Sequence, residues 1–183
     1  KDGKPDFGSI NAIDIDLFNK QLNDLLSGKK VSLPTFNFVL GKREYNGKNL
    51  QLGEKDIIIV EGLHALNDTL TSTIDKNQKY KIYISPLTQI SIDNHNHIHT
   101  SDIRKLRRIT RDSRTRGFGA KETLKMWPDI KAGERENIFR FQDDADIVVN
   151  SSLIYEIGVL KTYVEPLLFN VSEDDPEYPE ALR

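Results

Sequence analysis

The sequence has 183 residues, a formal net charge of −2, 30% charged residues and 37% hydrophobic residues. This length fits one domain with a hydrophobic core, and this composition excludes most classes of disordered protein. Because cysteine is absent and the net charge is close to zero, a disulfide framework, thiolate metal sites and an overall attraction to nucleic acid or anionic membranes are also excluded.

The first part of the chain predicts one helix followed by a hairpin. A helical pattern begins at Asp14, and Gly28 is placed to end it. Residues 31–40 and 43–52 predict two extended arms around a turn near Gly41. We therefore expect a β-hairpin inserted after the first helix.

Three apolar segments predict the strands of a central sheet. Residues 56–62 form a continuous β-branched run, which is typical of a strand covered on both faces. Residues 80–85 and 147–149 are further candidate core strands. These segments lie far apart in the sequence, so their pairing requires long connections between them.

Helical patterns fill the intervals between these strands. They cover about 101–114, 120–126, 129–142 and 153–168. A break is expected at Trp127-Pro128, because proline lacks the N–H that a helix interior needs. The acidic, proline-containing residues 172–183 are expected to form a frayed tail. Strands that alternate with helices predict an α/β fold with a mainly parallel sheet and flanking helices.

Glu61 is the first candidate for chemistry. It ends the predicted strand 56–62 and precedes Gly62, and open α/β sheets bind their ligands at this end of a strand. A carboxylate in this place can bind Mg²⁺ beside nucleotide phosphates, because a hard cation prefers oxygen ligands. The alternative is a carboxylate that only caps the next segment, and the residues leave both interpretations open.

Arginines are concentrated between Ser101 and Gly117, namely Arg104, Arg107, Arg108, Arg111, Arg114 and Arg116. At helical spacing their charges stack and repel, so acidic side chains or phosphates are expected as partners. The glycines at 117 and 119 provide a hinge such as a closing lid needs. The alternatives are a solvated face balanced by Asp102 and Asp112, and a nucleic-acid-binding helix, which the acidic total disfavours.

Two further patterns concern metal and phosphate. His95, His97 and His99 would point to one side of an extended segment and could bind zinc, whereas a metal-free exposed loop is the alternative. Residues 41–49 look superficially like a phosphate-binding loop, but five residues separate the glycines where four are needed. The sequence contains no GxxxxGK[ST] motif.

Taken in order, these segments resemble the uridine kinase/phosphoribulokinase family of P-loop kinases. The resemblance runs from about residue 6 to residue 168. It rests on Ala12-Ile13-Asp14, Pro34-Thr35-Phe36-Asn37-Phe38, Ile58-Ile59-Val60-Glu61-Gly62, Arg107-Arg108-Ile109-Thr110-Arg111-Asp112 with Arg116-Gly117, and Ala145-Asp146-Ile147-Val148-Val149. Residues 92–96, 124–128 and 139–142 are similar to a bacterial branch in which the kinase domain follows a threonyl-tRNA-synthetase-like region.

The resemblance implies that residues 1–183 are a partial uridine-kinase-like domain of the P-loop-kinase type, truncated at the N-terminus. Its first strand, phosphate-binding loop and an acidic residue that acts as base would lie upstream. It implies ATP and Mg²⁺ as cofactors. The residues that it assigns are Glu61 and Gly62 at the nucleotide, Glu61 at the metal, Arg108, Arg111 and Arg116 in catalysis, and Phe36, Asn37, Phe38 and Arg43 at the substrate.

The expected function is phosphoryl transfer from ATP to a nucleoside or similar small hydroxyl acceptor, with the fragment itself inactive. Gly8, Phe36 and Gly41 occupy positions where uridine kinases usually have Asp, Tyr and His, so the acceptor contacts depart from the family more than the phosphate contacts do. The alternatives are a kinase for another sugar-like acceptor, a nucleotide-binding regulatory module and an RNA-contacting domain. We expect a cytoplasmic protein without a membrane partner, and leave a homo-oligomer open.

Overall fold

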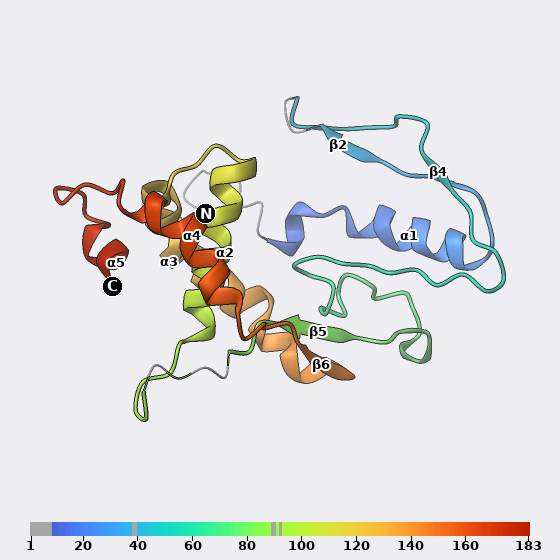
Figure 1. The fold of residues 1–183 in the computed structure, drawn as a ribbon. Helices are drawn as coiled ribbons and strands as arrows, with labels where there is room; N and C mark the ends of the chain where they lie inside the picture. Colours follow the sequence, from blue (N-terminus) through green and yellow to red (C-terminus); the bar gives the residue numbers. More distant parts are fainter. Residues whose placement is uncertain (1–8, 38–39, 89–90, 92) are drawn as a thin grey trace. The chain divides into compact units, whose positions relative to one another are not determined.

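The computed structural model describes residues 9–37, 40–88, 91 and 93–183 (Figure 1). Phe38, which was expected to contact the substrate, lies outside these residues. The structure divides into two compact units, Lys1–Lys81 and Ile82–Arg183.

The first unit begins with the helix that the sequence predicts. A single 3₁₀ turn, η1 (Ile10–Ala12), leads into α1 (Ile15–Leu26). Asp14 caps α1, because its Oδ1 accepts a hydrogen bond from the backbone N–H of Leu17 at 3.0 Å. Past the end of α1, Gly28 has φ +76°, a left-handed conformation that glycine adopts without strain. The predicted start and end of this helix are both confirmed.

Two antiparallel pairs of short strands form the predicted hairpin. They are β1 (Val31–Ser32) with β4 (Asn49–Leu50), and β2 (Thr35–Asn37) with β3 (Lys42–Glu44). Gly41 turns between β2 and β3 with φ +61°. The hairpin runs alongside α1 (Figure 1), where Nε2 of Gln21 donates to the carbonyl of Ser32 at 2.8 Å. Residues 41–49 are therefore part of a hairpin and not a phosphate-binding loop.

The predicted central strand at residues 56–62 is wrong. This segment is irregular, and the side chains of Ile57 and Ile59 are 86% and 89% exposed. A β-branched run favours a strand, but a strand forms only where a neighbour takes up its backbone hydrogen bonds. In the part of the chain that the structure describes, no strand pairs with this segment.

The end of the first unit is tied to α1 by one buried amide. Nδ2 of Asn19 donates to the carbonyl of Leu70 at 3.0 Å, and its Oδ1 accepts from Oγ1 of Thr73 at 2.9 Å. Leu70 and Ile74 are buried, and a 3₁₀ turn, η2 (Lys76–Gln78), follows. Because Asn19 is itself buried, both ends of its side chain need such partners.

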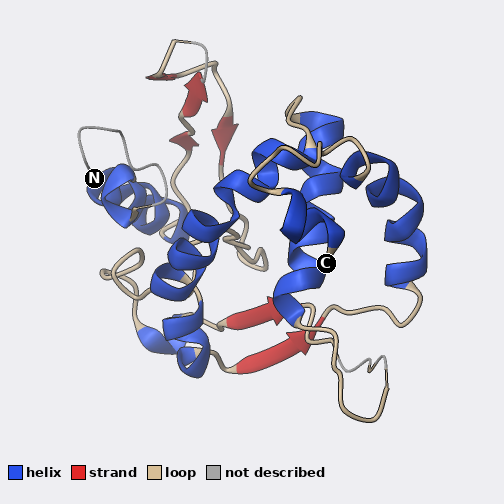
Figure 2. Ribbon diagram, turned by 90° about the vertical axis from the view of Figure 1, so that its left-hand side faces the viewer, coloured by secondary structure: helices blue, strands red, loops and turns tan. Residues whose placement is uncertain are grey.

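The second unit contains a parallel strand pair, β5 (Ile82–Ser85) and β6 (Ile147–Asn150), drawn in red near the bottom of Figure 2. Its register pairs Ile82 with Ile147, Tyr83 with Val148, Ile84 with Val149 and Ser85 with Asn150. Both strands were predicted, and the chain is α/β with a parallel pair. Tyr83 and Ser85 are buried, but the side chain of Ile84 is 64% exposed, so β5 is covered on one face.

Helices make up most of the second unit (Figure 2). They are α2 (Thr100–Thr115), α3 (Ala120–Asn137), α4 (Glu156–Leu168) and α5 (Tyr178–Leu182), with a 3₁₀ segment, η3 (Phe139–Asp144). The predicted break at Trp127-Pro128 is wrong, because α3 continues through Pro128. Proline removes its own N–H bond and crowds the carbonyl four residues earlier, but the buried side chains of Leu124 and Trp127 hold the preceding turns in the helix. Among the described helices, none is long and apolar enough to cross a bilayer.

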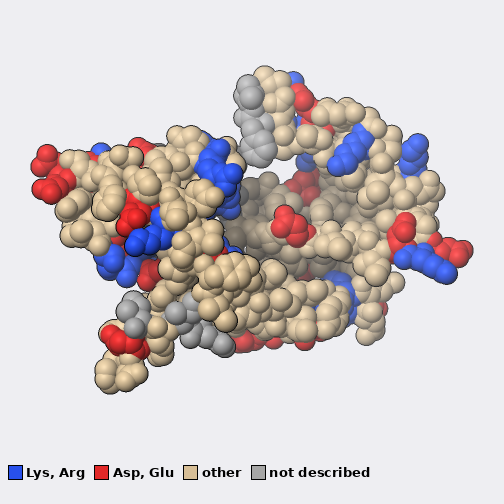
Figure 3. All heavy atoms as spheres, viewed as in Figure 1, with Lys and Arg blue, Asp and Glu red and all other residues tan. Residues whose placement is uncertain are grey.

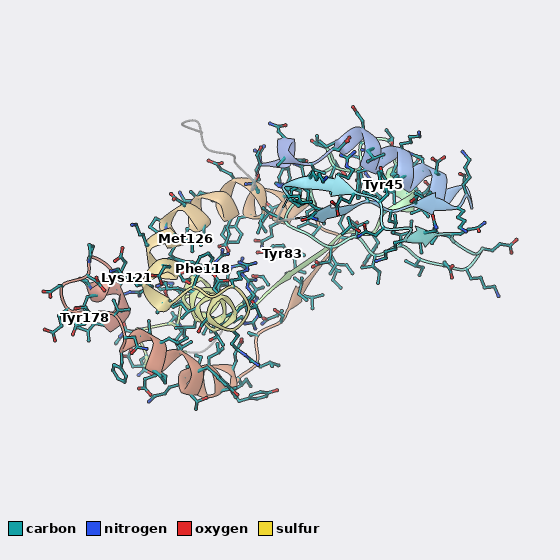
Figure 4. All side chains as sticks on the ribbon, turned by 90° about the horizontal axis from the view of Figure 1, so that it is seen from above. Tyr45, Tyr83, Phe118, Lys121, Met126 and Tyr178 are labelled. Atoms are coloured by element: carbon teal, nitrogen blue, oxygen red, sulfur yellow. The ribbon has the colours of Figure 1, made fainter. Side chains whose placement is uncertain are left out.

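The C-terminal segment, expected to be frayed, packs onto the second unit. The core there contains Ile109, Ala120, Leu124 and Val171, with Tyr178 and Ala181 packed against it. Lys121 of α3 and Tyr178 of α5 lie on neighbouring elements in Figure 4. Lys121 also pairs with Asp175 at 2.5 Å. Asp175 therefore contributes an ion pair to α3 as well as acidic charge.

Candidate functional site

Arg108 and Arg111 of α2 and Arg116, which caps the end of α2, converge on the carboxylate of Asp112, whose side chain is 0% exposed. Nε of Arg108 donates to its Oδ2 at 3.1 Å, and Nη1 of Arg116 donates to its Oδ1 at 3.0 Å. Nε of Arg111 lies 3.5 Å from the same Oδ1. Arg108 and Arg116 are each one helical turn from Asp112, so they lie on its face, and Arg111 is the residue directly before it. We call Arg108, Arg111, Arg116 and Asp112 the Asp112 cluster.

The Asp112 cluster has an excess of positive charge, because three guanidinium groups share one carboxylate. The side chains of Arg111 and Arg116 are 51% and 45% exposed, whereas that of Arg108 is 26% exposed. Burial lowers the pKa of Arg108 below its ordinary value; the charge of Asp112 opposes this, and the two neighbouring arginines add to it. Arginine nevertheless stays protonated in proteins, so an anion at this face would meet exposed cationic N–H groups.

The other arginines of α2 bind neighbouring elements of the second unit. Arg104 pairs with Glu134 of α3. Arg107 forms a two-pronged pair with Glu156 of α4, with Nη2 2.7 Å from Oε2. Arg114 lies over the ring of Tyr163 at 5.9 Å from the ring centroid. The predicted arginine helix thus separates into residues that attach α2 to α3 and α4, and residues that meet at Asp112.

The turn after α2 is built on Asp112 and Gly117. The backbone N–H groups of Arg116 and Phe118 both donate to the carbonyl of Asp112, at 3.0 and 3.3 Å. Gly117 has φ +70°, so the chain reverses there in a conformation that glycine adopts readily. This turn leads into Gly119 and the start of α3. The hinge role expected of the two glycines stays a prediction.

A pocket of about 310 Å³ lies in the first unit. It is lined by Ile13, Phe18, Val60, Glu61, Gly62, Leu63, His64, Ala65 and Leu70. Glu61 and Gly62, both predicted at the nucleotide, therefore share a pocket, and Gly62 has φ +155°, which favours glycine. His64 is 5% exposed, and its Nδ1 has no hydrogen-bond partner among the described residues. His64 was not predicted from the sequence, because no residue pattern around it indicates that it is buried.

The Mg²⁺ role expected of Glu61 stays a prediction, and its exposed position is compatible with a shared site and not with a closed metal cage. Its side chain is exposed at the pocket, and Mg²⁺ in nucleotide enzymes is held by one or two carboxylates together with phosphates and water. Within the described ranges, no group of three or more His, Asp or Glu side chains is placed to hold a metal ion. The zinc alternative therefore gains no support, and Nδ1 of His97 instead meets Oγ of Ser91 at 2.7 Å.

Three of the predicted substrate residues lie in the hairpin of the first unit. Nη2 of Arg43 pairs with Oδ2 of Asp14 at 2.6 Å, and Nδ2 of Asn37 donates to Oε2 of Glu44 at 3.1 Å. The hydrogen bond from the Leu17 backbone, followed by that from Arg43, lowers the pKa of Asp14. Phe36 has a half-exposed ring. Asn37 and Arg43 thus act within the unit, while Phe36 presents an aromatic face.

In Figure 3, basic and acidic side chains are interspersed among the coloured atoms on the drawn face of each unit, and neither unit shows a continuous basic track there. Binding to a nucleic-acid backbone relies on such a track or patch of Lys and Arg. These faces give no support to the RNA-contacting alternative.

Comparisons with known proteins agree with the sequence resemblance. Residues 1–157 match the sequence model of the phosphoribulokinase/uridine kinase family. A Staphylococcus aureus protein named uridine kinase is 36% identical over 161 residues, which cover 86% of this chain and 69% of the relative. A Staphylococcus epidermidis protein of the same name is 29% identical over 161 residues, which cover 86% of this chain and 69% of the relative. One from Staphylococcus carnosus is 29% identical over 163 residues, which cover 87% of this chain and 69% of the relative.

Proposed function

Because the chain belongs to the phosphoribulokinase/uridine kinase family, we propose that the protein transfers a phosphoryl group from ATP to a hydroxyl group of a nucleoside or similar small acceptor. Kinase-type phosphoryl transfer follows from the family and from the relatives named uridine kinase. The proposal also covers three more specific points, which are the class of acceptor, the use of ATP with Mg²⁺, and the roles of single residues.

The observation that supports the proposal most is the excess of cationic donors in the Asp112 cluster. A transferring phosphoryl group spreads negative charge over its oxygens, and enzymes of this kind act mainly by positioning and by neutralising that charge. Arg111 and Arg116 are half-exposed and already gathered at one face, so they are suited to phosphate oxygens. In this proposal Arg108, Arg111 and Arg116 contact the phosphates.

The pocket of the first unit takes the remaining roles. Glu61 would help to hold Mg²⁺, which would neutralise part of the phosphate charge. Gly62 lets the backbone turn directly beside that carboxylate. Phe36 would contact a planar ring of the acceptor by stacking.

The proposal extends to segments outside these residues. Since the sequence has no GxxxxGK[ST] motif, the phosphate-binding loop is expected from another segment of the protein, and the 183-residue chain alone is expected to be inactive. Residues 124–128 and 139–142, which resemble the corresponding bacterial branch, support a threonyl-tRNA-synthetase-like region in the same protein. Titration of the 183-residue chain with labelled ATP and Mg²⁺ tests whether its phosphate-binding loop comes from another segment. Micromolar binding of ATP by this chain would contradict that expectation.

The test of the function uses the full-length protein. Release of ADP from ATP and Mg²⁺ is measured with a panel of nucleosides and sugars, with an acceptor-free reaction as control. Acceptor-dependent ADP release together with a phosphorylated product supports the proposal. ATP binding without turnover on any acceptor would instead support a nucleotide-binding regulatory module, the alternative favoured by the internal pairing of Asn37 and Arg43.

A further inference from the structure

The ion pairs of α2 are of two kinds. Arg104 and Arg107 each use a carboxylate from another helix, Glu134 of α3 and Glu156 of α4. These pairs attach α2 to its neighbours. Asp112 differs, because its carboxylate meets only arginines of its own segment in the hydrogen bonds that the described residues make. Attachment of one helix to another therefore does not account for the carboxylate of Asp112.

Capping of α2 does not account for it either. The end of the helix is closed by the backbone carbonyl of Asp112, which accepts from the N–H groups of Arg116 and Phe118. Any residue at position 112 offers that carbonyl. The side chain is used separately, with Oδ2 directed to Arg108 and Oδ1 directed to Arg116 and Arg111.

A buried carboxylate between three guanidinium groups has a clear physical effect. Arginines one turn apart on a helix repel, and their long side chains adopt many rotamers in water. A central acceptor offsets the repulsion and selects the rotamers in which all three point to one place. Since Asp112 is fully buried, the anion would meet the exposed parts of Arg111 and Arg116 and not the carboxylate.

We propose that Asp112 is a positioning residue, which holds Arg108, Arg111 and Arg116 together as one binding group for the polyphosphate part of a nucleotide. This inference rests on the phosphate role given to the arginines in the proposed function. It gives Asp112 a role, which the proposed function does not. Asp112 acts through the arginines and does not itself contact the phosphate.

A positioning role for Asp112 can be distinguished from simple charge balance, because the two predict opposite changes in anion affinity when Asp112 is replaced by asparagine. Asp112→Asn removes a negative charge from beside three cations. If charge alone mattered, an anion would bind more tightly to this variant. If Asp112 positions the arginines, the anion binds more weakly although the net charge has become more positive. The two accounts therefore predict opposite changes in the dissociation constant.

The experiment uses inorganic tripolyphosphate as the probe and calorimetric titration of the full-length protein, in which the phosphate-binding loop is expected. Asp112→Asn is expected to weaken binding about tenfold, and Asp112→Glu, which keeps the carboxylate, is expected to bind more tightly than Asp112→Asn. The matched control is Glu134→Gln, which removes the carboxylate that pairs with Arg104 between two helices. That variant is expected to lower the Tm and to leave tripolyphosphate binding unchanged. Binding by Asp112→Asn that equals or exceeds that of the unmodified chain overturns the proposal.

A second measurement applies if Asp112→Asn does not fold. Arg116→Ala is compared in the unmodified chain and in the Asp112→Glu variant, whose longer side chain displaces the carboxylate. The loss of tripolyphosphate affinity is expected to be smaller in the Asp112→Glu background, because the two residues act together. Equal losses in both backgrounds overturn the proposal. Failure of the full-length protein to transfer phosphate would overturn the proposed function but not these binding results.

Discussion

Arg116 is bound to Asp112 through its side chain and through its main chain: Nη1 donates to Oδ1 at 3.0 Å, and the backbone N–H donates to the backbone carbonyl at 3.0 Å. Both bonds span one helical turn at the point where α2 ends. Gly117 then reverses the chain with φ +70°. The last arginine of the Asp112 cluster is therefore fixed in direction even though its side chain is 45% exposed.

The first prediction concerns the three arginines of this cluster. In the full-length protein, replacement of Arg108, Arg111 or Arg116 by alanine is expected to lower kcat/KM about a hundredfold, because a charged donor to the transferring phosphoryl group is lost. Arg104→Ala is the matched control, since Arg104 pairs with Glu134 on another helix. It is expected to lower the Tm and to change kcat/KM by less than about threefold. Losses below about tenfold for all three cluster variants would favour a solvated arginine face instead.

The local features of the fold could be predicted from the sequence, because a few neighbouring residues determine them. Asp14 and Gly28 fix the ends of α1, and Gly41 fixes the turn of the hairpin. The predicted strand at residues 56–62 and the predicted helix break at Pro128 are wrong for a common reason. A pattern gives a propensity, but pairing with a distant strand or packing of a buried neighbour decides the outcome.

The candidate site was predictable to a similar extent. The spacing of Arg108, Asp112 and Arg116 places them on one helix face, so their meeting could be expected. The complete burial of Asp112 could not, because it depends on the packing of the second unit. The burial of His64 depends likewise on contacts outside its own segment.

The second prediction concerns the docking of the C-terminal segment. Arg183, and with it Lys105, lowers the pKa of Glu180 to about 2. Because this pKa is below the usual value of 4.5, the ionised Glu180 stabilises the fold above about pH 4.5, and this stabilisation is lost as the pH falls towards 2. Glu180→Gln is therefore expected to lower the Tm at pH 6 and to differ little from the unmodified chain near pH 2.

Thermal unfolding at a series of pH values checks this expectation. Asp174→Asn serves as control, because Asp174 is an exposed carboxylate of the same segment. A Tm difference for Glu180→Gln that is absent at pH 6, or that does not shrink towards pH 2, would show that the segment is not held by this ion pair.

The third prediction concerns His64, a buried residue in the pocket that contains Glu61. A buried polar atom without a partner destabilises a fold by about 1–3 kcal/mol. His64→Leu keeps a similar volume, so it is expected to leave the free energy of unfolding unchanged or to raise it by about 1 kcal/mol. If the histidine contacts a ligand in the pocket, the same variant lowers kcat/KM in the full-length protein. A large loss of stability would contradict this account, and full activity would show that His64 does not contact a ligand in the pocket.

The last prediction concerns the choice of acceptor. A site selects a hydroxyl-rich ribose through buried polar partners, and a site that lacks them discriminates poorly. By the sequence resemblance, Phe36 occupies the position of a usual tyrosine. Asn37 is engaged with Glu44 in the hairpin, and Arg43 is engaged with Asp14 at the start of α1. The ring of Phe36 can stack on any planar base without choosing among bases. We therefore expect that uridine is not strongly preferred by the full-length protein.

A competition assay with saturating ATP and a panel of nucleosides and sugars measures this preference as a ratio of kcat/KM values. Phe36→Tyr is the informative variant, because it returns a hydroxyl to the same ring; it is expected to raise the preference for uridine about tenfold, the discrimination that one added hydrogen bond gives. Phe36→Leu is the matched control, since it removes the ring and is expected to lower kcat/KM for all nucleosides alike. If the unmodified protein prefers uridine or cytidine more than about a hundredfold over every other acceptor, the hairpin supplies the missing contacts from other side chains, and the expectation of relaxed specificity is wrong.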